Sequence, residues 1–446
     1  MDMNTLNVGF SRVDVTPMMG IDISGYFKKR LAEGVLDLLY ANTVAFRLGD
    51  ECAVMICIDN CGIKQDQLLV YRKRIAEKLN IPTESVFISC THTHTGPAVN
   101  ISDSLADEYK KILGDKLEEG ASLAYADLKG AKMGYGIGNA PGIAFVRRFR
   151  MKDGSIRTNP GVDNPDIVAP IGDVDERVNL LRFDREGADS VVIVNFGCHP
   201  DVVGGNLISA DWPGFVRNTV EKTIDNVKCV FFNGAEGDIN HVNVHPTGGF
   251  LNDMFMDFDD VARGYGHARY MGRVVAAGVL QAYDKVKYVE VDSLRAVNVK
   301  MDVPSNKPDK KDLPEAYRIK EMHESGRDDE LPYKGMMLTT VVAEALRMVR
   351  LENAPETFDM TLSGIRLGPV AIVGIPGEPF LGIGRGIKET EGFELIMPIC
   401  CANGYEGYFP MKDSYDEGGY EARSSNFRAG VAEFMIAEAK NMLSEL

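Results

Sequence analysis

Two histidines stand two residues apart in the stretch SCTHTHTGP, residues 89–97. His92 and His94 follow the apolar run SVFIS, which is typical of a buried strand. Side chains two residues apart point to the same side of an extended chain, so both imidazoles can face one cleft. Neutral imidazole is the commonest metal ligand in proteins, and a metal site is therefore one interpretation. The other is a polar loop with hydrogen-bonded imidazoles.

The same arrangement recurs twice further along the chain. His199 ends the apolar run SVVIVNFGCHP, and Glu378 follows AIVGI in the stretch AIVGIPGEP. In α/β sheets, ligands collect beyond the carboxyl ends of strands. Two histidines and a carboxylate are a common catalytic zinc set, with one position left for water. The pattern thus favours a shared metal site, against a capped turn at His199 and an exposed loop carboxylate at Glu378.

Three more segments carry polar groups that can serve such a site. In NGAEGDIN, Asp238 can orient a metal-bound histidine or satisfy its own turn. The run RRFR at 147–150 can supply a guanidinium to a substrate carboxylate or a developing oxyanion, or form a solvated basic loop. The Gly-rich stretch 402–422 holds four tyrosines, which line a pocket or pack at an edge.

The elements that position these residues alternate between strands and helices. We expect strands at residues 51–59, 85–90, 131–138 and 190–200, and within 227–240 a strand that runs into a Gly-bearing turn. Helices are expected at 64–80, 212–224 and 259–286, and one or two helices at 104–128. Hairpins and loops are expected at 147–166, a β-hairpin at 357–379 and a closing helix at 428–443. The charged, helical segment 305–355 indicates an insertion. The fold class predicted is α/β, with mixed β-sheets flanked by helices in one large catalytic domain spanning residues 1–446.

The amino-acid composition indicates which classes of partner and which cellular compartment to expect. The formal net charge of -16 argues against nucleic acid or an anionic membrane as the main partner. We see no apolar stretch of membrane-spanning length and no signal peptide at the N-terminus. The eight cysteines show no CxxC spacing, and several lie in apolar runs. We therefore expect a cytoplasmic protein with a small-molecule substrate, no nucleic acid and no stable membrane insertion; the oligomeric state is not indicated.

Six of these stretches, in this order, resemble the neutral ceramidase family and its shorter bacterial relatives. They are THTHTGP, RR before a Gly-rich hairpin, NFGCHP with LISADWPG, GAEGDIN, PGEP, and NGYEGYFPMKDSYDEGGYE. The resemblance implies a zinc-dependent amidase domain in which His92, His199 and Glu378 bind the metal.

The resemblance also implies roles for residues around the metal. Tyr408 matches the family's tyrosine near the metal, and His94, Arg147 and Tyr420 match residues that bind substrate around the scissile amide. Arg148 is an alternative to Arg147, because a slip of one residue in the loop would exchange them.

Two departures from the family pattern affect the expected substrate. The family places a serine, proposed to act in amide cleavage, where this chain has Asn240. An amide cannot be a nucleophile, though it can hydrogen-bond an oxyanion. Family members also carry an immunoglobulin-like C-terminal domain, whereas this chain ends soon after the tyrosine segment. We therefore expect a small soluble substrate rather than ceramide.

The leading hypothesis is a zinc hydrolase. Zinc lowers the pKa of bound water to about 7, so hydroxide can attack an amide carbonyl without a covalent serine step. His94, Arg147 and Tyr420 would stabilise the oxyanion at roughly 3 kcal/mol per donor, and Tyr408 would ligate zinc or protonate the leaving group. Two alternatives remain: an esterase, lactonase or isomerase of a sugar-like substrate at the same metal, and a non-catalytic, metal-stabilised binding protein.

Overall fold

The strand β4 (Glu51–Ile58) shows how the sequence sets up the layers. Its residues ECAVMICI are buried from Cys52 onward, so both faces of the strand are covered. Val54, Ile56 and Ile58 belong to one apolar cluster, whereas Met55 belongs to another. Because successive side chains of a strand point to opposite faces, the sheet that contains β4 has an apolar layer on each side.

The structure, a computed structural model, describes residues 5–446. Its large sheet contains both parallel and antiparallel strand pairs. Its strand order is β14-β12-β11-β6-β1-β3-β4-β5, with β18 beside β6. The pairs β4–β5 and β12–β14 are parallel, and the other pairs are antiparallel. The strands are β1 (Asn7–Asp14), β3 (Tyr40–Leu48), β4, β5 (Val86–Cys90), β6 (Lys129–Asn139), β11 (Arg177–Arg185), β12 (Ser190–Phe196), β14 (Val227–Asn233) and β18 (Lys287–Val289).

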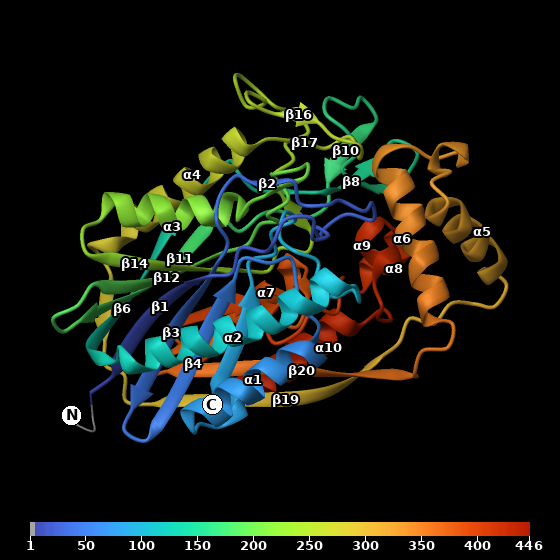
Figure 1. Ribbon diagram of the computed structural model, residues 1–446. Coiled ribbons are helices and arrows are strands. Elements are labelled where there is room, and N and C mark those ends of the chain that lie inside the picture. Colours follow the sequence, from blue (N-terminus) through green and yellow to red (C-terminus); the bar gives the residue numbers. More distant parts are fainter. Residues whose placement is uncertain (1–4) are drawn as a thin grey trace.

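Helices cover one face of this sheet, and a second sheet covers the other (Figure 1). The covering helices are α1 (Gln65–Leu79), α2 (Ser104–Ala126), α3 (Asp211–Thr223) and α4 (Tyr265–Tyr283). The second sheet has the order β19-β20-β21-β23. Its strands are β19 (Leu294–Pro304), β20 (Thr357–Leu367), β21 (Val370–Gly374) and β23 (Leu395–Ile399), and its outer face packs on α7 (Leu381–Lys388) and α10 (Val431–Glu445).

Short elements connect these four layers. The short strands are β2 (Gly34–Val35), β7 (Phe145–Val146), β8 (Arg148–Met151), β9 (Ile156–Thr158), β10 (Ile167–Pro170), β13 (Leu207–Ile208), β15 (Ile239–Asn240), β16 (Phe255–Met256), β17 (Ala262–Arg263), β22 (Glu378–Pro379) and β24 (Tyr408–Phe409). The short helices are η1 (Thr83–Ser85), η2 (Asp328–Glu330), α8 (Asp413–Glu417) and α9 (Tyr420–Ser424).

The segment 305–355 forms two helices at the edge of the molecule, α5 (Leu313–Glu324) and α6 (Gly335–Leu351) (Figure 1). They share a small apolar cluster that includes Ile319 and Val341, and α6 packs on α9. The segment is helical as expected. That it is an insertion stays a prediction.

The expected α/β class with mixed sheets and flanking helices is confirmed. Some boundaries are wrong. The helix expected at 259–286 begins at Tyr265, because Ala262 and Arg263 belong to β17 and Gly264 is extended. The strand expected at 190–200 ends at Phe196, so His199 lies in the following loop. Within residues 5–446, no helix has the length and apolar character that crossing a bilayer requires.

Candidate active site

Four buried side chains meet where strands of both sheets end. His92 lies just beyond β5, His199 beyond β12, Glu236 beyond β14 and Glu378 beyond β21. Each is at most 1% exposed. Their potential ligand atoms all lie within 4.8 Å of one another. The chain thus gathers two imidazoles and two carboxylates from four distant segments into one buried cluster.

The Glu378 carboxylate has one oxygen with a partner and one without. Its Oε1 accepts a hydrogen bond from Tyr405 Oη at 2.8 Å. Its Oε2 has no hydrogen-bond donor among residues 5–446, although it lies 3.4 Å from His92 Nε2 and 3.1 Å from His199 Nε2. A buried carboxylate oxygen is costly without a compensating positive charge. This donor set, two imidazole nitrogens and a carboxylate oxygen, fits a zinc ion.

The two imidazoles are oriented through their other ring nitrogens. His92 Nδ1 donates to the Cys61 carbonyl at 2.6 Å, and His199 Nδ1 donates to the Glu236 carbonyl at 3.0 Å. These partners assign the proton to Nδ1 and leave both Nε2 lone pairs facing Glu378. The backbone of His92 has a φ of 73°, which is uncommon for a non-glycine residue. The left-handed turn directs the ring into the cluster.

Electrostatics of the cluster also favour a cation. Burial lowers the pKa of His199, but the neighbouring Glu236 carboxylate raises it more, to about 9. Burial raises the pKa of Glu378, and His92 lowers it more, to well below its usual range. Both shifts show that the two carboxylates attract positive charge to the imidazoles, which a divalent cation can supply in place of protons.

His94 lies beside this cluster and is half-buried. Its Nε2 is 3.2 Å from His92 Nε2, and its ring packs edge-on against Tyr26 at 6.2 Å between centroids. A Cβ on Gly25 would come within 2.6 Å of the His94 ring, so only glycine allows the covering loop to approach this closely. Burial and the neighbouring His92 hold the pKa of His94 well below its usual range. The imidazole is therefore neutral and can exchange hydrogen bonds with a ligand.

Arg147, Tyr408 and Tyr420 extend the site away from the histidines. Tyr408 Oη is 3.3 Å from His199 Nε2, and the Tyr408 ring lies 5.5 Å from the Tyr420 ring. The Arg147 guanidinium lies 5.2 Å from the Tyr408 ring centre, and its Nε pairs with Glu421 Oε1 at 2.6 Å. Burial raises the pKa of both tyrosines. Both phenols therefore keep their protons at neutral pH.

The adjacent arginine points elsewhere. Arg148 donates to Ser414 Oγ at 2.8 Å and to Glu417 Oε2 at 3.0 Å. Consecutive side chains of an extended segment lie on opposite sides, so the two arginines cannot both reach Tyr408. The structure places Arg147, and not Arg148, beside the tyrosines.

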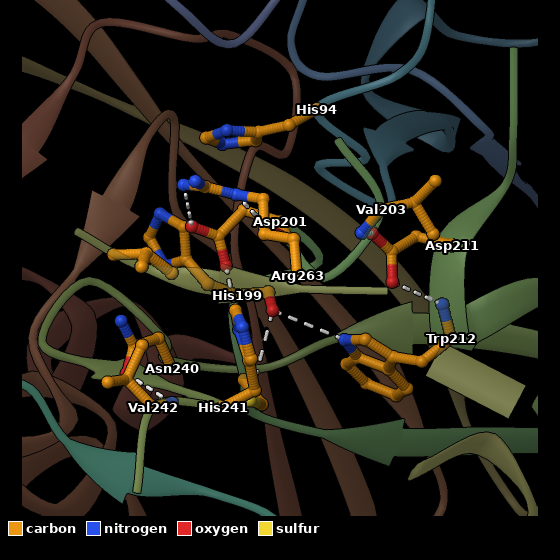
Figure 2. A network of polar contacts seen from close by, with 12 residues as sticks. His94, His199, Asp201, Val203, Asp211, Trp212, Asn240, His241, Val242 and Arg263 are labelled. Carbon is orange, nitrogen blue, oxygen red and sulfur yellow. Dashed lines mark hydrogen bonds and ion pairs between the residues drawn. The ribbon is translucent and has the colours of Figure 1, made fainter. Parts of the chain in front are cut away.

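Two residues of the NGAEGDIN turn have other partners. Asp238 Oδ1 accepts a hydrogen bond of 2.7 Å from the N–H of Leu381, the first residue of α7. Burial raises the pKa of the Asp238 carboxyl group to about 6. Within residues 5–446, Asp238 makes no hydrogen bond to a histidine. Asn240 Nδ2 donates to Asn159 Oδ1 at 3.0 Å. Its Oδ1 accepts from the Val242 N–H at 3.0 Å, as Figure 2 shows, so both ends of the amide have a partner. Its contact with an oxyanion stays a prediction.

A buried ionic network supports the loop after His199 (Figure 2). His241 Nδ1 faces Asp201 Oδ1 at 3.2 Å, and Arg263 Nε donates to the Asp201 carbonyl at 3.0 Å. His94 N–H donates to the carbonyl of Pro200 at 3.0 Å. The same loop thus carries His199 and holds the backbone of His94.

Two residues of the site did not emerge from the sequence. Glu236 forms an ion-pair contact with His199 Nδ1, and Tyr405 donates a hydrogen bond to Glu378 Oε1. Glu236 could have been found, because it follows the strand that ends at Asn233, as His92 and His199 follow theirs. Tyr405 had only its place in the tyrosine-rich segment as a signal.

The layers and the site together define a neutral ceramidase-like fold, as the sequence motifs indicated. The neutral ceramidase of Pseudomonas aeruginosa matches over 99% of this chain and 75% of its own, with a TM-score of 0.73 and 16% identity. A ceramidase structure complexed with C2 matches over 99% of this chain and 76% of its own, with a TM-score of 0.70 and 16% identity. No protein-family model matches the sequence.

Proposed function

We propose that this chain is a zinc-dependent amidase that hydrolyses an N-acyl bond of a small soluble substrate. The observation that carries the proposal is the buried Glu378 oxygen without a donor, which faces two imidazole nitrogens at 3.4 and 3.1 Å. The two similar structures are those of ceramidases, and ceramide is an amide. We further propose that the protein acts in the cytoplasm.

His92, His199 and Glu378 would hold the zinc ion, with Tyr408 at its edge. Zinc in such a site supplies Lewis acidity and a water of lowered pKa, about 7. Glu236 and Tyr405 would keep the ligands oriented, since Glu236 contacts His199 Nδ1 and Tyr405 donates to Glu378 Oε1, the atoms of these two side chains that do not face the proposed metal.

The remaining side chains suit the charge that develops on an amide carbonyl. Arg147 is a fixed cation whose Nε is paired with Glu421 and whose Nη2 donates to the Gly237 carbonyl at 2.5 Å. His94 is neutral, and Tyr420 and Tyr408 are protonated phenols, so each can donate a hydrogen bond. A single oxyanion donor is worth about 3 kcal/mol in transition-state stabilisation. Tyr408 can also transfer its proton to the leaving amine.

No serine acts as a nucleophile in this proposal, because Asn240 stands at the family's serine position. Water would attack the carbonyl directly. The proposal therefore predicts no acyl-enzyme and no burst of product in the first turnover.

The test is to purify the full chain, measure its zinc content, and assay N-acyl amides before and after chelation. About one zinc per chain and activity that zinc restores would support the proposal. A metal-free protein with full amidase activity would contradict it. Esters, lactones and sugar isomerisation are assayed in parallel, since the same site could serve them, and a zinc-loaded protein inactive on every class would indicate a binding function.

A further inference from the structure

The loop 24–30 covers His94, one of the proposed substrate contacts. A Cβ on Gly25 would come within 2.6 Å of the His94 ring, and the Tyr26 ring packs edge-on against the same ring. Arg30 Nη2 donates to the His94 carbonyl at 2.6 Å, so the loop is also attached to the backbone of this histidine. The loop is therefore held close to the site.

The same loop also reaches Tyr420. The Phe27 ring packs edge-on against the Tyr420 ring, with 6.5 Å between the ring centroids. The Tyr420 ring in turn lies 5.5 Å from the Tyr408 ring. Phe27 is 41% exposed and Tyr408 is 8% exposed, so this row of three rings leads from the metal-binding cluster toward solvent and ends at Phe27. Figure 1 shows the blue loop approaching α9, which begins at Tyr420.

A hydrogen bond joins this loop to the segment 305–355. His323, on α5, has its Nε2 3.1 Å from the Phe27 carbonyl oxygen. Its Nδ1 lies 3.0 Å from both carboxylate oxygens of Asp328. Both partners are acceptors, so a ring with a proton on each nitrogen makes both hydrogen bonds. Asp328 thus orients the imidazole that contacts the loop.

The segment 305–355 also holds α9. The helix α6 packs on α9, and Arg347 on α6 donates through Nε to the Arg423 carbonyl at 2.8 Å. Arg423 Nε donates in turn to Glu344 Oε2 at 2.8 Å. The segment therefore fixes both sides of the contact between Phe27 and Tyr420, although it supplies no ligand of the proposed metal.

We propose that Phe27 determines specificity by limiting the length of the amine part of the substrate, and that His323 is a positioning residue that keeps Phe27 beside Tyr420. The inference rests on the proposed amidase function and specifies its substrate class, N-acyl derivatives of small amines. Tyr408 would protonate the leaving amine, so this part of the substrate lies toward Tyr420 and Phe27. A long chain on the nitrogen would collide with the Phe27 ring, and such a steric contact excludes one substrate without improving the binding of another.

The first test measures whether His323 holds the loop. Hydrogen exchange of the amides in residues 20–32 is followed by mass spectrometry on the full chain at pH 6.5, with and without zinc. His323→Ala should speed this exchange about two- to tenfold, as expected for the loss of one hydrogen bond. His323→Gln, whose amide can still donate to the Phe27 carbonyl, should restore most of the protection. The exposed His245→Ala is the matched control.

The second test measures what Phe27 excludes. The probes are N-methyl- and N-octylacetohydroxamic acid, which bind zinc through the same two oxygens and differ only in the length of the chain on the nitrogen. Calorimetry measures their binding to the zinc-loaded full chain. Wild type should bind the N-methyl probe at least about fivefold more tightly, and Phe27→Ala should reduce this ratio at least about threefold. His323→Ala should reduce it by a smaller factor, and the partly exposed Phe434→Ala on α10 should leave it unchanged.

Each result decides the inference. Faster exchange in His323→Ala that His323→Gln reverses, together with a binding ratio that falls in Phe27→Ala, supports it. Equal exchange in His323→Ala and His245→Ala would overturn the positioning role. A wild type that binds both probes equally, binds neither, or discriminates as well without the Phe27 ring would overturn the specificity role. A zinc-loaded protein that discriminates between the probes but hydrolyses no amide would contradict the amidase function alone, so the two proposals fail separately.

Discussion

His92 and His94 are neighbours in the sequence and face the same space, but their second nitrogens have different surroundings. His92 Nδ1 is held by the Cys61 carbonyl at 2.6 Å, which leaves Nε2 as a fixed ligand atom. His94 Nδ1 is buried without a partner among residues 5–446, and the ring is half-buried. This difference favours a metal ligand at His92 and a substrate contact at His94.

The pair can be separated by mutation. His92→Ala should lose zinc and activity together, because one of the three proposed ligands is removed. His94→Ala should retain zinc and lose about 10²–10³-fold in kcat, as expected for a lost oxyanion donor. Metal analysis and steady-state kinetics measure both, with the exposed His245→Ala as control. Equal zinc loss in both variants would show that the pair binds the metal jointly.

Tyr405 offers a test of ligand positioning. Tyr405→Phe removes the hydrogen bond to Glu378 Oε1 and leaves the ring in place. Zinc affinity should fall about 10–100-fold, as is usual when a partner of a metal ligand is removed. Competition with a chelator measures the affinity, and the exposed Tyr317→Phe should leave it unchanged. An unchanged affinity in Tyr405→Phe would mean that Glu378 needs no such support or does not bind zinc.

Among the elements, α4 carries a histidine, His267, at a position where a protonated, positively charged imidazole is unfavourable. His267 lies in the first turn of α4, where the helix dipole disfavours a cation, and it is 3% exposed. Burial, with a smaller contribution from His241, lowers the pKa of His267 to about 4. The folded protein therefore resists protonation of this ring, whereas the unfolded chain accepts a proton near its ordinary pKa of about 6.5.

This difference predicts a pH dependence of stability. The contribution of neutral His267 is complete above about pH 6.5 and is lost as the pH falls from 6.5 toward 4, because protons then favour the unfolded chain. His267→Phe should reduce that loss by on the order of 2 kcal/mol. Urea unfolding at pH 7.5 and 4.5 of wild type and variant measures it, and His245→Ala serves as the exposed control. If the free energy of unfolding of His267→Phe and of wild type fell equally between pH 7.5 and 4.5, the lowered pKa of His267 would not account for the pH dependence.

The molecule as a whole should depend on its metal for stability. The proposed ligands come from the ends of strands in both sheets, so a cation bound only by the folded state links the layers. At a free zinc concentration of a thousand Kd, the linkage adds about 4 kcal/mol to the free energy of unfolding.

Calorimetric melting with zinc and with chelator tests this dependence. Wild type should lose several degrees of Tm on chelation, and Glu378→Gln, which cannot supply the anionic oxygen, should show no difference between the two conditions. A wild-type Tm that chelation leaves unchanged would argue against a contribution of the metal to stability.

The sequence predicted the fold class and the polar residues that follow strands. His92, His199 and Glu378 could be identified because an apolar run precedes each one, and a strand end is a local signal. The packing of the two sheets could not be read in this way, because β4 is apolar on both faces and its pattern does not say what covers it. Glu236 and Asp238 show the same limit on a small scale: the direction of the turn decides which of them meets a histidine, and spacing alone does not.

The ligand set also has a consequence for how the chain reaches its working state. Its members are as far apart as residues 92 and 378, and none lies within 35 positions of another. Contacts of such long sequence separation form late, since closing large loops costs entropy before any contact repays it. A nascent chain that has emerged only through β14 has both imidazoles but lacks the carboxylate of Glu378. Coordination of the proposed metal by all three ligands therefore requires that the chain has been synthesised at least through Glu378 and that this segment has docked.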